Sequence, residues 1–152
     1  MDNFKTVDEV LLFAIQQEEA SLKLYTELAK KIFPFELRDL FKQFANEEKK
    51  HIAILQAIDK KKLTQATTHT VTDLKISDFL VEATTLDNMT YQKALTIAIQ
   101  REKAAFNLYM ELASKTDDDK FKNLFINLAK EEAEHKLKYE KQYDDDFLMS
   151  DV

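Results

Sequence analysis

The 152-residue chain contains no glycine and only one proline, Pro34. Sheets and hairpins need tight turns, and tight turns depend on these two residues. Their near absence argues against a sheet-rich fold and favours long helices joined by few connections. The abundance of alanine, leucine, glutamate, lysine and glutamine agrees with this. The length is sufficient for one domain with its own core, and we predict a single domain over residues 1–152.

Cysteine is also absent. The chain therefore cannot form a disulfide framework, a zinc-thiolate site, a rubredoxin-type iron centre or an iron-sulfur cluster. This composition suits the cytosol, and we predict a cytoplasmic protein. No apolar run approaches the roughly 20 residues that span a bilayer. The first ten residues lack the basic and apolar regions of a signal peptide, so we expect neither a signal peptide nor a membrane partner.

The formal net charge is −6, and the only basic run is Lys60–Lys62. An acidic chain without a basic face is a poor nucleic-acid binder, so we expect no nucleic-acid partner. We interpret the lysine run as the solvated C-terminal end of a helix, where cations interact well with the helix dipole.

The sequence contains an internal repeat, because a shift of 84 positions aligns the first half with the second. With only two copies, it is a duplication rather than a solenoid. The aligned pairs that matter below are Glu18 with Glu102, Tyr25 with Tyr109, Glu48 with Glu132, and His51 with His135.

Each copy has the apolar spacing of a helical hairpin. In the first repeat, about residues 6–62, a helix should begin at a Thr6 cap with Glu9 completing a capping box, and end near Ile32. The next helix should follow Pro34, which is tolerated in a first helical turn, and run to about Lys61.

The second repeat, about residues 90–145, should contain a helix from a Thr90 cap to about Lys115. Another helix should start around Asp117–Asp119, where acidic side chains suit a helix N-terminus. The apolar positions that we assign to this last helix are Phe121, Leu124, Phe125, Leu128 and Leu137.

A connection of about residues 63–89 separates the repeats. Its threonine-rich first part should be irregular or extended, and a short helix capped by Ser77 is expected in residues 77–83. So long a connection can cross the full length of a bundle. The pattern predicts an all-α, antiparallel four-helix bundle of two repeated hairpins joined by a long crossover. The C-terminal residues 144–152 should be frayed.

Six polar residues fall within the apolar stripes of these helices. Glu18 shares its helix face with Ala14 and Leu22, and Glu48 shares its own with Ala45 and His51. The second repeat has the same arrangement, so the candidate set is Glu18, Glu48, His51, Glu102, Glu132 and His135.

Four buried carboxylates without partners would be very costly. No lysine or arginine occupies the matching core positions, but two divalent metal ions would balance the four negative charges. One Glu from each of two helices and one Glu-x-x-His from each of the other two is the ligand pattern of di-iron and di-manganese carboxylate bundles. This donor set suits two iron ions, two manganese ions or a mixed Mn/Fe centre. The alternative is a metal-free bundle with these residues exposed or paired.

The neighbouring residues have more ordinary interpretations. Tyr25 and Tyr109 lie two turns beyond Glu18 and Glu102, so each either donates a hydrogen bond to a ligand carboxylate or is a core tyrosine bonded elsewhere. Glu47 and Glu131 precede the candidate glutamates, and we expect both to be solvated. His69 lies in the threonine-rich connection and should be exposed.

At these residues the chain resembles the rubrerythrin-like branch of the ferritin-like superfamily. The matching stretches are AIQQEEASLKLYTELA with EEKKH and AIQREKAAFNLYMELA with EEAEH. The resemblance covers about residues 6–142. It implies a ferritin-like bundle with a dinuclear iron site that reacts with hydrogen peroxide or dioxygen. It also implies a homodimer that protects against oxidative stress.

Two departures from the family are visible. Rubrerythrins carry a further metal-binding glutamate one turn beyond the ligand of the third long helix, but this chain has Ala105 there and Ser21 at the repeat-related position. The expected site is therefore a symmetric one with six ligands. The chain also lacks a rubredoxin domain, so electrons should come from a separate donor protein.

These features together predict a dinuclear iron oxidoreductase of the peroxidase or oxidase type, acting on hydrogen peroxide or dioxygen. An organic substrate remains open. One rival is a non-catalytic iron carrier or a ferroxidase that handles iron, and another is a bundle in which the metals only stabilise the fold.

Overall fold

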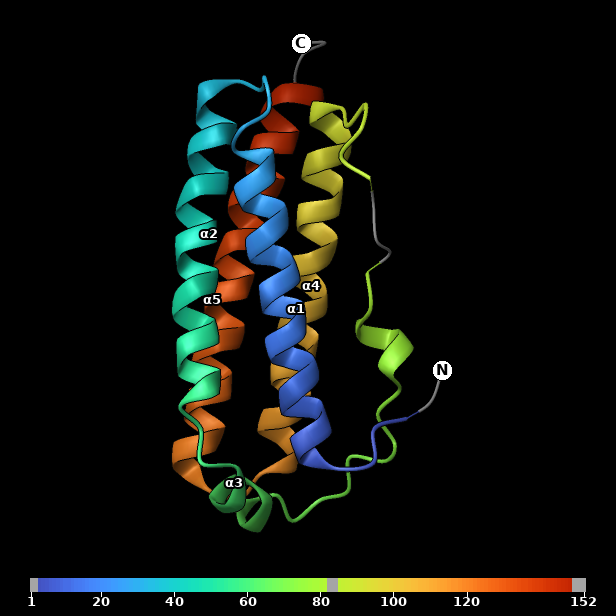
Figure 1. The fold of residues 1–152 in the computed structure, drawn as a ribbon, viewed down its shortest axis with the longest axis vertical. Helices are drawn as coiled ribbons and strands as arrows, with labels where there is room; N and C mark the ends of the chain where they lie inside the picture. Colours follow the sequence, from blue (N-terminus) through green and yellow to red (C-terminus); the bar gives the residue numbers. More distant parts are fainter. Residues whose placement is uncertain (1–2, 82–84, 149–152) are drawn as a thin grey trace.

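The computed structural model describes residues 3–81 and 85–148, and in these ranges four long helices stand side by side (Figure 1). They form two antiparallel hairpins, one of α1 and α2 and the other of α4 and α5. The crossover climbs the outside of the bundle, so that α4 also runs antiparallel to α1. Their bounds are α1 Val7–Leu28, α2 Phe35–Gln56, α4 Tyr91–Lys115 and α5 Asp119–Tyr143.

The predicted helix starts are confirmed. The Thr6 and Thr90 hydroxyls accept hydrogen bonds from the third residue of α1 and of α4, and the Asp118 carboxylate accepts two from the start of α5. The capping box at α1 differs in one detail. The Glu9 carboxylate accepts from the backbone N–H of Lys5 rather than from that of Thr6. Pro34, expected in the first turn of α2, instead occupies the N-cap position just before this helix.

The predicted end of α1 at Ile32 is wrong, because the helix stops at Leu28. The N–H groups of Lys30 and Lys31 bond to the carbonyls of Glu27 and Leu28, three residues back. These shorter bonds tighten the last turn and direct the chain into Pro34, which fits the restriction that a proline imposes on what precedes it.

The predicted extension of α2 to Lys61 is also wrong. That helix ends at Gln56, and a separate short helix, α3 (Lys60–Ala66), follows. The Asp59 carboxylate accepts hydrogen bonds from the N–H groups of Lys61 and Lys62 and so starts a new helix. The lysine run is solvated, as expected, but it begins a helix instead of ending one. Leu63, predicted to be irregular or extended, is helical and fully buried. Figure 1 shows its helix, α3, at the lower end of the bundle.

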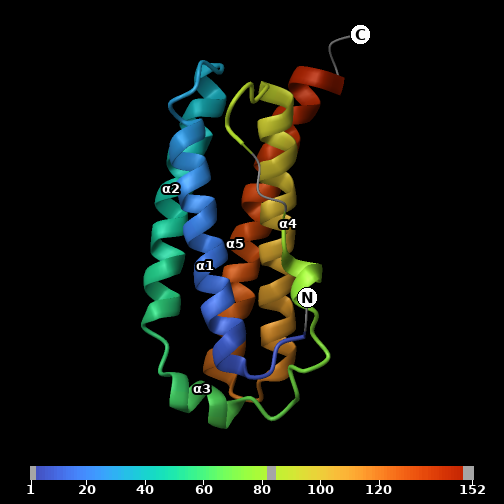
Figure 2. The same ribbon diagram turned by 45° about the vertical axis from the view of Figure 1, so that its right-hand side comes forward.

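The rest of the crossover runs alongside α4 and contains one turn of 3-10 helix, η1 (Ile76–Phe79) (Figure 2). This turn begins after Lys75, so the predicted Ser77 cap is not used. The N–H of Phe4 donates to the carbonyl of Leu74, which fixes the start of the chain to the crossover. Glu82 and Ala83, which we expected to extend the short helix, lie outside the described residues.

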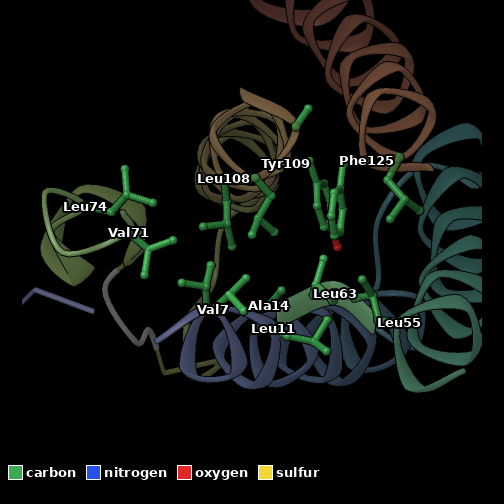
Figure 3. Close-up of a cluster of buried hydrophobic side chains, with 14 of the residues drawn as sticks. Val7, Leu11, Ala14, Leu55, Leu63, Val71, Leu74, Leu108, Tyr109 and Phe125 are labelled. Carbon is green, nitrogen blue, oxygen red and sulfur yellow. The ribbon is translucent and has the colours of Figure 1, made fainter. Parts of the chain in front are cut away.

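The core is divided into two apolar clusters along the bundle axis. The lower cluster includes Leu11, Leu55 and Phe125, and Figure 3 shows that Leu63 of α3 and Val71 of the crossover also belong to it. The upper cluster gathers around Tyr25, Phe41, Phe44 and Tyr139. Leu137 does not belong to either, contrary to prediction, because 64% of it is exposed. Residues between the two clusters therefore occupy a layer that is sealed by apolar side chains on both sides.

The C-terminal segment is more ordered than predicted over its described part. A turn of π-helix, η2 (Asp144–Leu148), continues α5 directly. The Phe147 ring packs against the rings of Tyr91 and Tyr143, which holds this turn against the start of α4. Residues 149–152 lie outside the described part. Among the helices that the structure describes, none is both long and apolar enough to cross a membrane.

Candidate metal centre

The six polar residues singled out by the sequence meet in the layer between the two apolar clusters. Glu18 comes from α1 and Glu102 from α4. The two Glu-x-x-His pairs come from α2 and α5. All six are buried, with at most 5% of any of them exposed: Glu18, Glu48, His51, Glu102, Glu132 and His135. The helical spacing noted above places them on inward faces, and the four-helix packing brings those faces together.

Within the described residues these six side chains form two groups of potential metal ligands. One group contains Glu18, Glu48, His51 and Glu132, and the other contains Glu48, Glu102, Glu132 and His135. In each group the ligand atoms lie within 4.8 Å of one another. Glu48 and Glu132 belong to both groups. The arrangement therefore offers two adjacent metal positions that share two carboxylates.

The imidazoles direct their Nδ1 atoms at the carboxylates. His51 Nδ1 lies 2.7 Å from Glu132 Oε1 and 3.3 Å from Glu18 Oε2. His135 Nδ1 lies 3.5 Å from Glu48 Oε1 and 3.6 Å from Glu102 Oε2. Each Nδ1 atom therefore faces carboxylate oxygens from two helices other than its own.

Each of the six residues has one buried polar atom without a hydrogen-bond partner in the part of the chain described. These atoms are Glu18 Oε2, Glu48 Oε1, His51 Nδ1, Glu102 Oε2, Glu132 Oε1 and His135 Nδ1. An unsatisfied buried polar group costs about 1–3 kcal/mol. Six of them in one layer, all capable of donating a lone pair, fit the chemistry of a dinuclear metal site.

The tyrosine hydrogen bonds are present, and they cross between the repeats. Tyr25 donates to Glu102 Oε1 at 2.9 Å, and Tyr109 donates to Glu18 Oε1 at 2.9 Å. Each bond occupies one oxygen of its carboxylate and leaves the other oxygen directed to the metal layer. In Figure 3 the Tyr109 hydroxyl points away from α4 toward the inside of the bundle.

The carboxylates that belong to both ligand groups are held in an unusual electrostatic environment. Burial raises the pKa of Glu48 and of Glu132 well above the ordinary range, and the neighbouring carboxylates raise both further. For Glu18 burial also acts to raise the pKa, but the neighbouring Glu48 and His51 side chains outweigh it and the pKa is lowered. Crowded carboxylates of this kind retain protons until a cation replaces them.

Glu131 is a functional candidate that the sequence analysis missed. We predicted a solvated side chain, and 46% of it is indeed exposed, but its Oε2 lies 3.1 Å from His51 Nε2. A carboxylate at this nitrogen favours the tautomer with the proton on Nε2 and the lone pair on Nδ1. The pair of glutamates before each histidine is visible in the sequence, but it did not show which of them would contact a histidine of another helix.

The other predicted residues lie where expected. Glu47 is partly exposed and forms a 4.0 Å ion pair with Lys50. The His69 side chain is 60% exposed. At the position of the additional family ligand, Ala105 offers no donor atom, and the Ser21 hydroxyl accepts a hydrogen bond from Arg101.

Comparisons with known proteins agree with this architecture. A sequence model described as rubrerythrin matches residues 9–143. A crystal structure from Thermotoga maritima, described as a ferritin-like diiron-carboxylate protein, superimposes with a TM-score of 0.72 at 24% sequence identity. That match covers 94% of this chain and 97% of the other, and it confirms the ferritin-like four-helix bundle. No curated protein sequence matches the chain.

Proposed function

The chain belongs to the rubrerythrin family, and from this premise we propose that it is a dinuclear iron oxidoreductase that reduces hydrogen peroxide or dioxygen. The same site could hold two manganese ions or a mixed Mn/Fe centre in place of two iron ions. The observation that carries it is the layer of six buried side chains, each with one unpartnered donor atom among the described residues. We propose these six as the metal ligands.

The proposed ligation gives each metal position one histidine and one glutamate of its own. His51 and Glu18 serve one position, and His135 and Glu102 serve the other. Glu48 and Glu132 are common to both and would bridge them. Four carboxylates balance the charge of two divalent ions, which removes the cost of burying the carboxylates alone.

Two bound ferrous ions would supply the two electrons that, with two protons, convert hydrogen peroxide into two water molecules. The protein contributes orientation and enclosure. The Tyr25 and Tyr109 hydroxyls hold the terminal carboxylates in place, and the apolar clusters above and below exclude bulk water. Glu48 and Glu132, with their raised pKa values, hold protons that they release when cations bind.

We also propose a separate protein as electron donor, because the chain has no cysteine for a rubredoxin-type centre of its own. A homodimer and a role in oxidative-stress protection, which the family resemblance implies, are part of the proposed function. The same site would serve a ferroxidase or iron-handling protein, so only reactivity separates these functions.

The test is an anaerobic titration of metal-free protein with Fe(II), followed by stopped-flow absorbance after separate addition of hydrogen peroxide and of dioxygen. Saturation at two irons per chain, rapid oxidation by peroxide and reversible re-reduction are expected. Faster reaction with dioxygen, with iron accumulating beyond two per chain, would favour iron handling. Two tightly held metals inert to both oxidants would leave only a structural site.

A further inference from the structure

The two imidazoles that face the metal layer have different partners on their outer side. The Glu131 carboxylate lies 3.1 Å from Nε2 of His51. The ion pairs of His135 involve its Nδ1, and among the described residues no carboxylate lies at its Nε2. Its ring instead stacks on Phe44, with 4.0 Å between the centroids and 18° between the planes. A stacked ring covers the face of the imidazole and not the edge that carries Nε2. Phe44 therefore orients His135 without acting on its Nε2 proton.

The internal repeat indicates why Glu47 does not serve His135 as Glu131 serves the other histidine. The two glutamates are repeat mates and occupy the same register on their helices. Glu47 forms a 4.0 Å ion pair with Lys50, one turn further along α2. The residue that corresponds to Lys50 in the second repeat is Glu134. Opposite charges one helical turn apart attract and like charges repel. Lys50 therefore holds Glu47 along its own helix, whereas Glu134 favours the turn of Glu131 toward α2.

A cation near His135 adds to this difference. Lys138 Nζ lies 5.7 Å from the centre of the Phe44 ring, which stacks on His135. The repeat mate of Lys138 is Ile54, so the first repeat has no charge at this position. A positive charge opposes the binding of a metal cation nearby, although solvent weakens the effect because Lys138 is exposed. Both differences therefore favour metal binding at the position of His51.

The carboxylate at His51 is the larger of the two effects. A carboxylate on the outer nitrogen of a ligating imidazole fixes its tautomer and raises its basicity. Loss of such a partner lowers metal affinity by about 10- to 100-fold. The six ligands themselves provide each metal position with the same donor types. A difference in affinity must therefore come from the residues around them.

We propose that the two metal positions bind with unequal affinity: the position of His51 fills first and retains its ion, and the position of His135 fills second and exchanges. Lys50 is a positioning residue, because it keeps Glu47 away from His135. The inference rests on the proposed function, in which the six buried residues ligate two metals. The exchangeable position is the one at which iron or manganese is selected as the second ion.

The test is a Co(II) titration of metal-free protein in competition with a chelator, followed through the visible spectrum. A second ion binds against the charge of the first even at equal positions, so the test is the response of each step to substitution. Lys50→Glu copies the second repeat and should release Glu47 toward His135. The second step should become up to about tenfold stronger, and the first should not change. Combining Lys50→Glu with Glu47→Ala should abolish this gain.

Lys49→Glu is the matched control, since it makes the same change of charge at the neighbouring exposed position of α2 and should leave both steps unchanged. An equal gain in Lys49→Glu, or a gain that survives Glu47→Ala, would assign the effect to net charge and overturn the inference. An unchanged second step in Lys50→Glu would also overturn it. Each of these results leaves the proposed function standing. A wild-type protein that binds fewer than two Co(II) ions would overturn both.

Discussion

Glu18 and Tyr25 of the first hairpin correspond to Glu102 and Tyr109 of the second, and each tyrosine donates to the carboxylate of the other hairpin. Each hairpin also contributes one Glu-x-x-His pair to the central layer. In the residues that they contribute to the central layer, the two hairpins are therefore equivalent. Since two equal metal positions require equal donor sets, the chemistry of ligation accounts for this likeness.

The two hairpins differ one contact further out. His51 has the Glu131 carboxylate at its Nε2, whereas His135 stacks on the Phe44 ring with 4.0 Å between ring centroids. Arg101 of the second repeat faces Gln17 of the first. Atoms that touch the metals are constrained by coordination, but the residues around them can diverge. We infer that the duplicated ligands create two metal positions in unequal surroundings.

Loss of a shared carboxylate should have the largest effect. Because Glu48 and Glu132 belong to both ligand groups, Glu48→Ala or Glu132→Ala should abolish stable binding of two metals and not merely of one. Metal analysis after desalting measures this. Glu47→Ala, adjacent but partly exposed, is the control and should retain both metals. Full retention in the Glu48 and Glu132 variants would show that these carboxylates are not bridges.

The two shared carboxylates, Glu48 and Glu132, should contribute equally to the pH dependence of the stability of the metal-free protein. Their pKa values are raised in the folded state, so the fold retains protons that the unfolded chain has released above about pH 4.5. Stability from this source is therefore greatest at low pH and falls as pH rises, by up to about 1.4 kcal/mol per pH unit for each carboxyl.

Urea unfolding of metal-free protein at a series of pH values gives that slope. Glu48→Gln and Glu132→Gln should each flatten it by a similar amount, because each removes one of two equivalent groups. The lowered pKa of Glu18 acts in the opposite sense, with stability lost as pH falls below the carboxyl range. Slopes that match wild type in both variants would show that these carboxyls do not hold the protons.

The contrast between the six candidate ligands and the residues around them also accounts for what the sequence could predict. Glu18, Glu48 and His51 were recognisable because a charged residue in an apolar stripe is costly to bury. Its recurrence at a fixed offset indicates a site that compensates for this cost. Helix starts were predicted because Thr6, Thr90 and Asp118 act through local hydrogen bonds.

Contacts between helices were less predictable. Whether Glu131 reaches solvent or His51 depends on the rotation of α5 against α2, which spacing along one helix does not show. Arg101 was overlooked for the same reason, since it approaches the ligand layer from the side and not from a core position. The helix ends at Leu28 and Gln56 depend on turn geometry and on the burial of Leu63, neither of which follows from apolar periodicity.

Substitution of Glu131 and of its repeat mate Glu47 tests whether the different surroundings of the two histidines affect metal binding. Glu131→Ala should lower affinity at the metal position of His51 by about tenfold, because the imidazole loses the carboxylate that fixes its tautomer. Glu47→Ala should have no such effect. Competition with a chelator, followed through the visible spectrum of the Co(II)-loaded protein, measures both affinity and ligand geometry.

Glu131→Gln provides a further check on that interpretation, since its amide oxygen can still accept from Nε2 and should restore most of the affinity. Equal metal affinities in Glu131→Ala and Glu47→Ala would show that the different surroundings of the two histidines do not affect metal binding.

The smallest expected effect concerns the tyrosines. Tyr25→Phe and Tyr109→Phe each remove one buried hydrogen bond and should each cost about 1 kcal/mol of unfolding free energy. Tyr139→Phe is the control. Its hydroxyl is buried and has no hydrogen-bond partner among the described residues, so its removal should be neutral or slightly stabilising. Chemical denaturation of metal-free protein compares the three. Equal losses for Tyr25 and Tyr109 would extend the likeness of the hairpins from geometry to energy. If one loss is much larger, the different surroundings of His51 and Arg101 also affect the tyrosine–carboxylate hydrogen bonds. The two hairpins are then alike in geometry but not in energy.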